Sequence, residues 1–428
     1  MSIQKNGTGM LAIGKKLPFE QFALLLNVTL CYGWATFFLN TAIVSLPGLR
    51  RWHFLLMQKL RKRVITSETD FDALAPAWRV LESQVPQLLP FQSFDWNRCW
   101  WTIFADASVF HRDELLICTL YDDQQLVAVM PLTNTHVGLH TLFLYRYVRP
   151  FGADPNLTEL RVPLALPEYT ETILQQWEDL SKQETFGLTE FQLIHTKDHA
   201  DHFLANNHAV SPLSERSMPN FVLHLEGDWP SFKSNLKRNI KESLRRCYNS
   251  LKRDNLQARL KVLRGRSEIL PELADFYRLH SARASAMQTV AHPDYFANPR
   301  HRAFLEALLA SDFGERMALF CLELDGRIVA VRIGFLMGEE LYLYYSGYEL
   351  EFGKYSVMTT LLAEIAQWAF TQSIRRLNLS VGDDVSKTRW GPEKCDYVEY
   401  QCVKNTVWRK KIGEGIYKLR QLRKSMIA

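Results

Sequence analysis

The chain has 428 residues, 47% hydrophobic and 12% aromatic, enough to bury the cores of roughly two or three domains, which excludes an intrinsically disordered protein. Its 51 Lys and Arg residues against 46 Asp and Glu residues give a formal net charge of +5, too small an imbalance to imply a nucleic-acid or membrane partner by itself. The seven cysteines never form a Cys-x-x-Cys pair, so they indicate neither a disulfide framework nor a zinc site and favour a reducing compartment.

The first predicted element is an uncharged, mostly apolar stretch at residues 21–49, followed by basic residues between 50 and 63. A run of this length can cross a bilayer as a helix, and the positive charges behind it would keep the rest of the chain on the cytoplasmic side. Polar Asn and Thr residues within the run weaken that prediction, so a buried N-terminal extension is the alternative. We expect residues 1–63 to be a separate apolar extension of a cytoplasmic protein, either free or attached to the inner face of the membrane.

The pattern between residues 64 and 227 is typical of an α/β domain. Apolar side chains recur at helical spacing in residues 66–85 and 91–104, and two apolar runs on either side of residues 122–124 predict a β-hairpin. The elements expected after the hairpin are strands at 142–148 and 190–195, a helix at 169–182 and a short strand at 220–227.

The same order of elements recurs in residues 228–428. A long helix capped by Asp228 or Ser231 comes first, and a second helix follows at 272–287. The pair Asp325-Gly326 between two apolar runs predicts a hairpin, and a third strand follows it. The remaining predicted elements are a helix from Ser356, a strand at 375–380, a polar loop, a last strand at 397–405 and a basic C-terminal helix.

Six segments of the sequence carry a family resemblance. In chain order they are LAPAWRVLESQVPQLLPFQSFDWNRCWWTIF, LLICTLYDDQQLVAVMPL, WPSFKSNLKRNIKESLRRC, LADFYRLHSAR, KYSVMTTLLAEIAQWA and LNLSVGDDVSKTRWG, within residues 66–403. With this order of elements the chain resembles the CelD/BcsL-like acetyltransferase group of the GNAT superfamily and, more distantly, the FemABX peptidyltransferases. The resemblance implies an α/β (α+β) fold of two fused GNAT-like domains, 64–227 and 228–428, with mixed, mostly antiparallel sheets flanked by helices.

The resemblance also implies a donor site. In a GNAT fold the pyrophosphate of an acyl-CoA donor, such as acetyl-CoA, lies on the amide groups that open the long helix, because unpaired N–H groups and the helix dipole favour anions there. The residues at that position are Gly353, Lys354, Tyr355 and Ser356. Two residues depart from the family pattern, because Met358 replaces a usual glycine and Asn378 stands where an aspartate is frequent. No metal is expected.

Acyl transfer needs a proton donor for the leaving thiolate and a base for an acceptor that arrives protonated. Tyr344 and Tyr345 are expected to point to opposite faces of their strand, so one of them can look into the cleft, and Tyr345 is taken as the candidate. Asp383 and Asp384, where Gly382 lets the chain turn at the end of a strand, are candidate bases. His280, on a predicted helix, is another.

Three further residues are candidates for binding the acceptor. Lys387 can neutralise an acidic group, Trp390 can stack on a sugar ring, and Arg283 lies near His280 on the predicted helix. The histidine-rich segment 195–202 has spacings that a metal could use, but no matching ligands lie elsewhere, so we predict no metal site there. The basic residues between 233 and 253 are compatible with a solvated helix face, acidic lipid or RNA.

The function expected from the resemblance is transfer of an acetyl or other acyl group from acyl-CoA to an amine or hydroxyl of a cell-envelope or exopolysaccharide-related acceptor. The partner would be a small-molecule or saccharide acceptor, with membrane association through residues 21–49. Two alternatives stay open. One is a FemABX-like aminoacyl or peptidyl transferase, for which tRNA would be the only expected nucleic-acid partner. The other is a non-catalytic accessory protein of polysaccharide biosynthesis, which the departure at Met358 favours.

Overall fold

The computed structural model describes residues 60–139, 142–153, 157–182, 188–286, 292–406, 411–415 and 417–418. The chain divides into two compact units, residues 1–60 and 61–428, and the description below concerns the second unit together with Leu60. The predicted membrane segment at 21–49 and most of the predicted basic C-terminal helix lie outside the described residues. Within the described ranges, no helix combines the length and the apolar character needed to span a bilayer.

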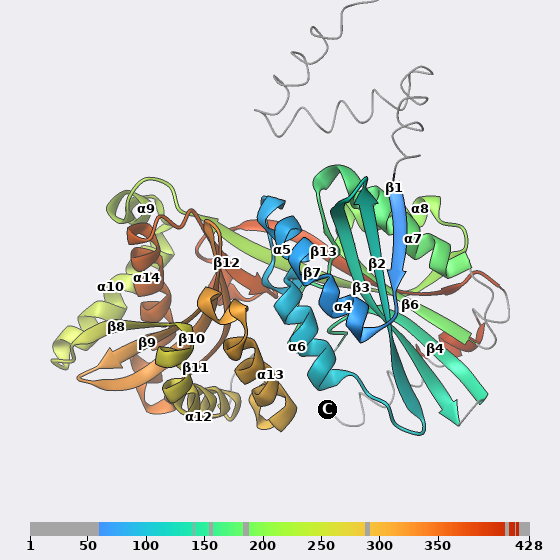
Figure 1. The fold of residues 1–428 in the computed structure, drawn as a ribbon. Helices are drawn as coiled ribbons and strands as arrows, with labels where there is room; N and C mark the ends of the chain where they lie inside the picture. The colour runs from blue at the N-terminus through green and yellow to red at the C-terminus, as the bar shows by residue number, and fades with distance from the viewer. Residues whose placement is uncertain are drawn as a thin grey trace, which may run out of the picture. The chain divides into compact units, whose positions relative to one another are not determined.

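The described strands form one mixed 13-stranded sheet in the order β1-β2-β3-β4-β6-β13-β7-β12-β11-β10-β9-β8, with β5 paired to β3 (Figure 1). In the first half the strands are β1 (Leu60–Ile65), β2 (His111–Asp122), β3 (Gln125–Leu139), β4 (Leu142–Pro150), β5 (Leu164–Ala165), β6 (Leu188–Thr196) and β7 (Val210–His224). In the second half they are β8 (Ala258–Arg264), β9 (Met317–Leu324), β10 (Arg327–Met337), β11 (Glu340–Tyr348), β12 (Arg376–Val381) and β13 (Glu393–Lys404).

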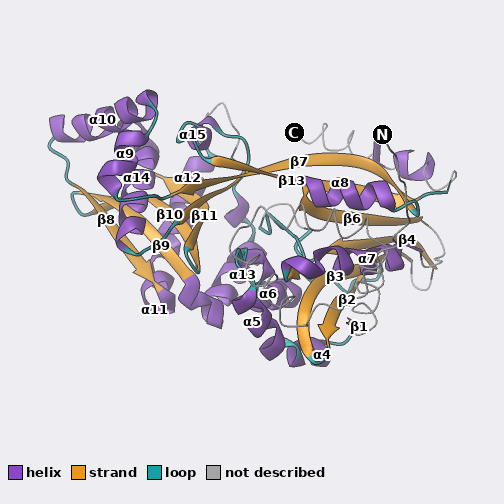
Figure 2. Cartoon of the chain, turned by 90° about the horizontal axis from the view of Figure 1, so that it is seen from above, coloured by secondary structure: helices purple, strands orange, loops and turns teal. Residues whose placement is uncertain are grey.

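Helices pack on both faces of the second-half strands and bury two separate cores. One core lies under α9, α10 and α14, and the other contains side chains from α5, α6, α12 and α13 (Figures 1 and 2). The helices are α4 (Glu68–Ala73), α5 (Ala75–Gln84), α6 (Phe94–Phe104), α7 (Thr170–Lys182), α8 (Lys197–Asn206), α9 (Trp229–Asn235), α10 (Arg238–Arg253), α11 (Gly265–Ile269), α12 (Leu273–Ala284), α13 (Pro299–Ala310), α14 (Val357–Thr371) and α15 (Val385–Thr388).

The two halves repeat one topology and exchange their last strands. In each half an antiparallel series leads to a parallel pair, β4 with β6 and β11 with β12, whose strands are connected through α7 and α14 respectively. The last strand of the first half, β7, pairs with β12 of the second, and β13 returns to pair with β6. Figure 2 shows β7 and β13 side by side between the halves. The sheet is therefore continuous between the two halves. The domain boundary between residues 227 and 228 stays a prediction.

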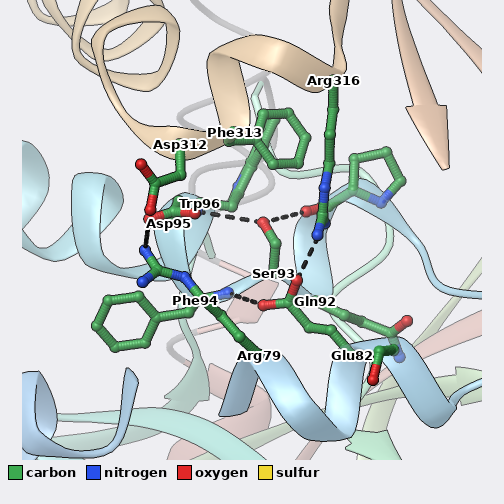
Figure 3. Close-up of polar contacts among 12 residues, drawn as sticks. Arg79, Glu82, Gln92, Ser93, Phe94, Asp95, Trp96, Asp312, Phe313 and Arg316 are labelled. Carbon is green, nitrogen blue, oxygen red and sulfur yellow. Dashed lines mark hydrogen bonds and ion pairs between the residues drawn. The ribbon is translucent and has the colours of Figure 1, made fainter. Parts of the chain in front are cut away.

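An aromatic core and a buried ion pair also join the halves. The ring of Trp96 on α6 lies 5.0 Å from that of Phe304 on α13, between centroids. Below it, the buried carboxylate of Glu82 accepts the Phe94 N–H at 2.8 Å and pairs with Arg316 of the second half at 3.0 Å (Figure 3). Separating the halves would expose this apolar surface and leave the buried Glu82 without its cation, and both changes would cost free energy.

Most predicted elements are present, with differences that have local causes. Asp325 and Gly326 have φ of 50° and 83° and close the predicted β9–β10 hairpin with a two-residue turn, as a primed turn requires. The long helix predicted from Asp228 is instead two helices, because Leu236 and Lys237 adopt extended backbone angles between α9 and α10. The segment 195–202 ends β6 and begins α8, a helix that the sequence reading missed. It also missed α13 and β8.

Candidate active site

The parallel pair β11–β12 opens partway along its length. Residues 340–342 pair with residues 376–378, and beyond them the two strands, which continue to Tyr348 and Val381, are no longer paired with each other in this described region. The register of β11 against β10 shifts by one residue between Leu343 and Ser346, and that of β12 against β7 shifts between Asn378 and Val381. Such bulges release backbone groups from the ladder and bend the strand, so the opening is built into both strands.

Ser380 and Asn378 fix the bulge on β12. Ser380 has a φ of 69°, in the left-handed region that residues other than glycine seldom occupy. The buried Asn378 side chain accepts the Ser380 N–H at 2.9 Å through its Oδ1 and donates from Nδ2 to a carboxylate oxygen of Glu340 at 2.9 Å. Left-handed backbone of this kind costs on the order of 1–3 kcal/mol and persists where neighbours hold it. Asn378, the residue that departs from the family pattern, therefore serves as a backbone clamp here.

Helix α14 begins beside the opening with an exposed electropositive end. Its N-cap, Ser356, has φ 54° and ψ 43°, and its side chain makes no capping hydrogen bond. The N–H groups of Val357 and Met358 belong to the first turn, where no intrahelical acceptor exists, and the helix dipole adds partial positive charge. Arg389 adds a positive charge at this end of the helix, where it donates a hydrogen bond to Thr359 Oγ1 at 2.6 Å. The start of α14 is therefore suited to an anionic group.

A cavity of about 520 Å³ lies between the open strands, the start of α14 and the loop after β12. Its lining includes six of the residues proposed from the sequence: Arg283, Gly353, Ser356, Asp384, Lys387 and Trp390. Further lining residues are His292, Arg332, Tyr348, Val357, Met358, Thr359, Leu362, Leu379, Ser386 and Arg389. The cavity thus brings the predicted donor segment and the predicted acceptor loop to one place.

The structure places the other five proposed residues outside that lining. The ring of His280 lies 5.5 Å from that of Tyr345 between centroids, and both belong to the aromatic packing under α12. Asp383 is exposed. The Tyr355 hydroxyl donates to Asp254 at 2.8 Å, and the Lys354 ammonium lies 4.9 Å from the Tyr355 ring centroid. Their proposed roles stay predictions. The prediction that Tyr344 and Tyr345 point to opposite faces of β11 is wrong, because their ring centroids lie 4.4 Å apart and both pack against the same core; the register shift at this point of the strand disrupts the regular alternation.

Glu159, from the first half, is a residue that the sequence reading missed. It lies after β4, in a segment that reaches the point where β11 and β12 separate. Its carboxylate accepts hydrogen bonds from Tyr342 Oη of β11 at 2.5 Å and from Ser380 Oγ of β12 at 2.8 and 2.9 Å. Burial raises the pKa of Glu159, although these hydrogen bonds and the charge of Lys387 oppose the shift. A carboxylate with a raised pKa is a stronger base than an ordinary one.

Asp384 is a weaker base than Glu159. Its side chain caps α15 by accepting the Ser386 N–H at 2.7 Å. Burial raises the pKa of Asp384, but the hydrogen bonds from Ser386 and the charge of Lys387 outweigh that effect and leave the pKa lowered. Of the two carboxylates, Glu159 is therefore the stronger base, whereas Asp384 is the one that lines the cavity.

Three cations also converge on the cavity. Arg283 donates to Ser346 Oγ at 2.5 Å, and Lys387 Nζ donates to the Val381 carbonyl at 2.5 Å. Burial lowers the pKa of Lys387 to about 8, with the nearby charge of Arg332 acting in the same direction. Arg332, from β10, has its own pKa lowered to about 10 by burial and by the charge of Arg283. Arg332 was not proposed from the sequence, because it stands inside an apolar strand without a motif.

The comparisons with known proteins agree with this geometry. Residues 238–390 match the family model described as an acetyltransferase (GNAT) domain, a range that contains α10, β11, α14 and the loop after β12. No curated protein sequence matches the chain. The solved structure of FemX resembles it with a TM-score of 0.51 and 11% identity, covering 79% of this chain and 97% of that one.

Two further solved structures resemble the chain more weakly. The C-terminal domain of a protein described as a lysylphosphatidylglycerol synthetase from Agrobacterium fabrum covers 80% of this chain and 94% of its own length, at 11% identity and a TM-score of 0.45. A tandem GNAT protein from the clavulanic acid biosynthesis pathway covers 81% and 98%, at 8% identity and a TM-score of 0.43.

The chain therefore has a GNAT-like α/β fold, and the predicted fold class is confirmed. All residues that line the cavity fall within the range 238–390 that matches the GNAT family model. The resemblance to the CelD/BcsL-like group stays a prediction.

Proposed function

We propose that the protein is an acyltransferase that moves an acyl group from a coenzyme A thioester to an amine or hydroxyl. The observation that supports this most directly is the position of the cavity, which joins the start of α14 to the opening between β11 and β12. GNAT folds generally use acyl-CoA as the donor, and a helix start beside a roomy cavity suits its phosphates.

The residues at the start of α14 fit such a donor. The first-turn N–H groups of Val357 and Met358 can bind phosphate oxygens, and Arg389 adds a guanidinium whose buried Nε has no hydrogen-bond partner among the described residues. The replacement of a glycine by Met358 does not remove this feature, because Met358 lies within the helix. The left-handed angle falls on Ser356 instead. In this proposal the donor site is intact despite the departure from the family pattern.

The chemistry assigned to this chain is a single displacement. The acceptor nitrogen or oxygen attacks the thioester carbonyl, a C–N or C–O bond forms, and the C–S bond breaks with its electron pair leaving on the thiolate. Glu159 takes the proton that the acceptor loses, which its raised pKa favours. The acceptor class in this proposal is the cell-envelope or exopolysaccharide precursor that the family resemblance implies.

Calorimetric titration of the full chain with acetyl-CoA tests the proposal. We expect saturable binding, weakened roughly tenfold by Arg389→Met, because a hydrogen bond to a charged group is worth about 1.5–3 kcal/mol. Arg375→Met is the matched control, since Arg375 is an exposed arginine paired with Glu339 at 3.2 Å outside the cavity. Absence of binding by both acetyl-CoA and CoA would contradict the proposal and leave the two alternatives, the aminoacyl transferase and the accessory role.

An activity assay on the same protein distinguishes our proposal from the aminoacyl-transferase alternative. The likeness to FemX concerns the fold, so it does not select a donor. We expect acetyl-CoA to be consumed without charged tRNA. Transfer that depends on charged tRNA and leaves acetyl-CoA unchanged would replace our proposal with that alternative.

A further inference from the structure

We propose that the acceptor carries a carboxylate or a phosphate, and that Arg283, Arg332 and Lys387 bind this group in the cavity. This inference rests on the proposed function, and it specifies the chemical class of the acceptor. The three side chains come from α12, β10 and the segment after β12, and all three line the same cavity.

Arg332 has no direct hydrogen-bond or ion-pair partner among the described residues, although the charges of Glu159 and Asp384 lie near it. It stands opposite Ser346 in the β10–β11 register, so its side chain and that of Ser346 share one region of the sheet. Its buried Nε has no hydrogen-bond partner, and no ion pair is found for it among the described residues. Burying a cation without a partner is costly, so a position of this kind favours a bound anion.

The nearby carboxylates already have partners. Glu159 accepts hydrogen bonds from Tyr342 and Ser380, and Asp384 caps α15 through Ser386. Neither makes a direct ion pair with Arg332 or Lys387 among the described residues. Two engaged carboxylates therefore face three cations, and the cavity has an excess of positive charge.

The three cations lie close enough for their positive charges to affect pKa values within the cluster. Burial lowers the pKa values of Arg332 and Lys387, and the neighbouring positive charges lower them further, while the charges of Glu159 and Asp384 partly oppose both shifts. Arg283 is already oriented by its bond to Ser346 Oγ and by a contact with His292. Positioned guanidinium groups bind carboxylates and phosphates through two parallel N–H donors, which gives both affinity and orientation. An acceptor anion held here would present its reacting group to the opening where Glu159 lies.

This cluster is distinct from the donor end of the cavity. Arg389 contacts Thr359 of the first turn of α14, whereas Arg283 contacts Ser346 of β11 and Lys387 contacts Val381 of β12. A donor thioester and an acceptor anion can therefore use different cations. The arrangement gives each substrate its own anchor within one cavity.

Thermal unfolding of the full chain in saturating CoA tests the inference, since CoA occupies the donor end. Inorganic phosphate and acetate are added separately, each against chloride of equal ionic strength. We expect at least one of them to raise the unfolding temperature on the order of 2–4 °C beyond chloride, because a ligand that binds only the folded state stabilises it. The stronger of the two anions then distinguishes a phosphorylated acceptor from a carboxylated one.

Three variants make the test specific. Arg332→Met should weaken the apparent anion affinity at least tenfold, whereas Arg332→Lys should retain part of it. Arg327→Met is the matched control on the same strand, because Arg327 is exposed and pairs with Glu351 at 2.7 Å. A general salting effect of phosphate would remain equal in all of these proteins.

Two results would overturn the inference: no stabilisation beyond chloride in the unmodified protein, or equal stabilisation after both Arg332→Met and Lys387→Met. CoA binding is measured in the same samples, so failure of the donor site is seen independently. The anion titration repeated without CoA still reports on the three cations in that case.

Discussion

Each half has an opening, a place where the pairing of two parallel strands ends, and the two openings differ in the volume of the space beside them. In the second half β11 continues to Tyr348 beyond its pairing with β12, and a cavity of about 520 Å³ lies there. In the first half β4 ends at Pro150, two residues after its last pair with β6, and the corresponding space is about 20 Å³. The same strand arrangement thus leaves a large cavity where β11 and β12 separate and little space where the pairing of β4 and β6 ends.

The segment after β4 accounts for the difference. Arg161 turns into the first opening, where it donates to the carbonyls of Gly152 at 3.0 Å and Thr158 at 2.9 Å and pairs with the buried Glu399 at 2.6 Å. Two residues earlier, Glu159 reaches the second opening. The same short segment therefore fills one opening and places a carboxylate at the other.

The largest expected effect concerns Glu159. If it is the base, Glu159→Gln should lower kcat roughly 10²- to 10⁴-fold with little change in acetyl-CoA affinity. In the unmodified enzyme, activity should rise with pH through the pKa of Glu159, which burial places above the ordinary value for a glutamate, because only the ionised form accepts a proton. The variant should lose that acidic limb of the pH–rate profile, as steady-state kinetics would show. An acidic limb that persists in the variant would remove Glu159 from the mechanism.

Many of the elements around the second opening could be predicted from the sequence, because they depend on short-range sequence patterns. The hairpin at Asp325-Gly326, the helix after Ser356 and the polar loop with Asp384, Lys387 and Trp390 all depend on short-range patterns. Glu159 could not be predicted, because it comes from the other half to bond Tyr342 and Ser380 beside the cavity, and its local sequence has no pattern of its own. The bulges on β11 and β12 also escaped prediction, since register depends on the partner strands.

The second prediction tests whether Arg161, which fills the first opening, contributes to stability and not to acetyl-CoA binding. Arg161→Met should destabilise the protein by about 3 kcal/mol, because it removes the donor to two carbonyls and leaves the buried Glu399 with Arg216 as its remaining cation. Acetyl-CoA affinity per folded molecule should not change. Urea unfolding and calorimetry measure the two quantities. The double variant Arg161→Met/Glu399→Gln should recover part of the stability, and weakened acetyl-CoA binding would show that the first opening has a direct role in the site.

The third prediction concerns Asn378, whose side chain holds the bulge on β12 where this strand separates from β11. Asn378→Asp should cost about 2 kcal/mol at neutral pH, because it replaces a donor to Glu340 with a second carboxylate in a buried place. The loss should shrink as pH falls, since protonation of either carboxyl restores a hydrogen-bond donor between them. Urea unfolding at neutral and acidic pH measures this. A loss that does not depend on pH would show that shape, rather than charge, makes asparagine necessary.

The smallest effect separates backbone strain from ligand binding at Ser356. Ser356 and Ser373 have φ of 54° and 58°, and Ser356 makes no capping hydrogen bond with its side chain. Relief of left-handed strain offsets the extra freedom of glycine in the unfolded chain, so Ser356→Gly and Ser373→Gly should each stabilise the protein by about 0.5–1 kcal/mol.

Only Ser356 lines the cavity, so its variant should bind acetyl-CoA a few-fold more weakly while Ser373→Gly binds it normally. Thermal unfolding and calorimetry on the matched pair give both numbers. If both variants gain stability and neither changes affinity, the left-handed serine shapes the start of α14 without contacting the donor. The anion site at that end would then depend on the first-turn N–H groups and Arg389 alone.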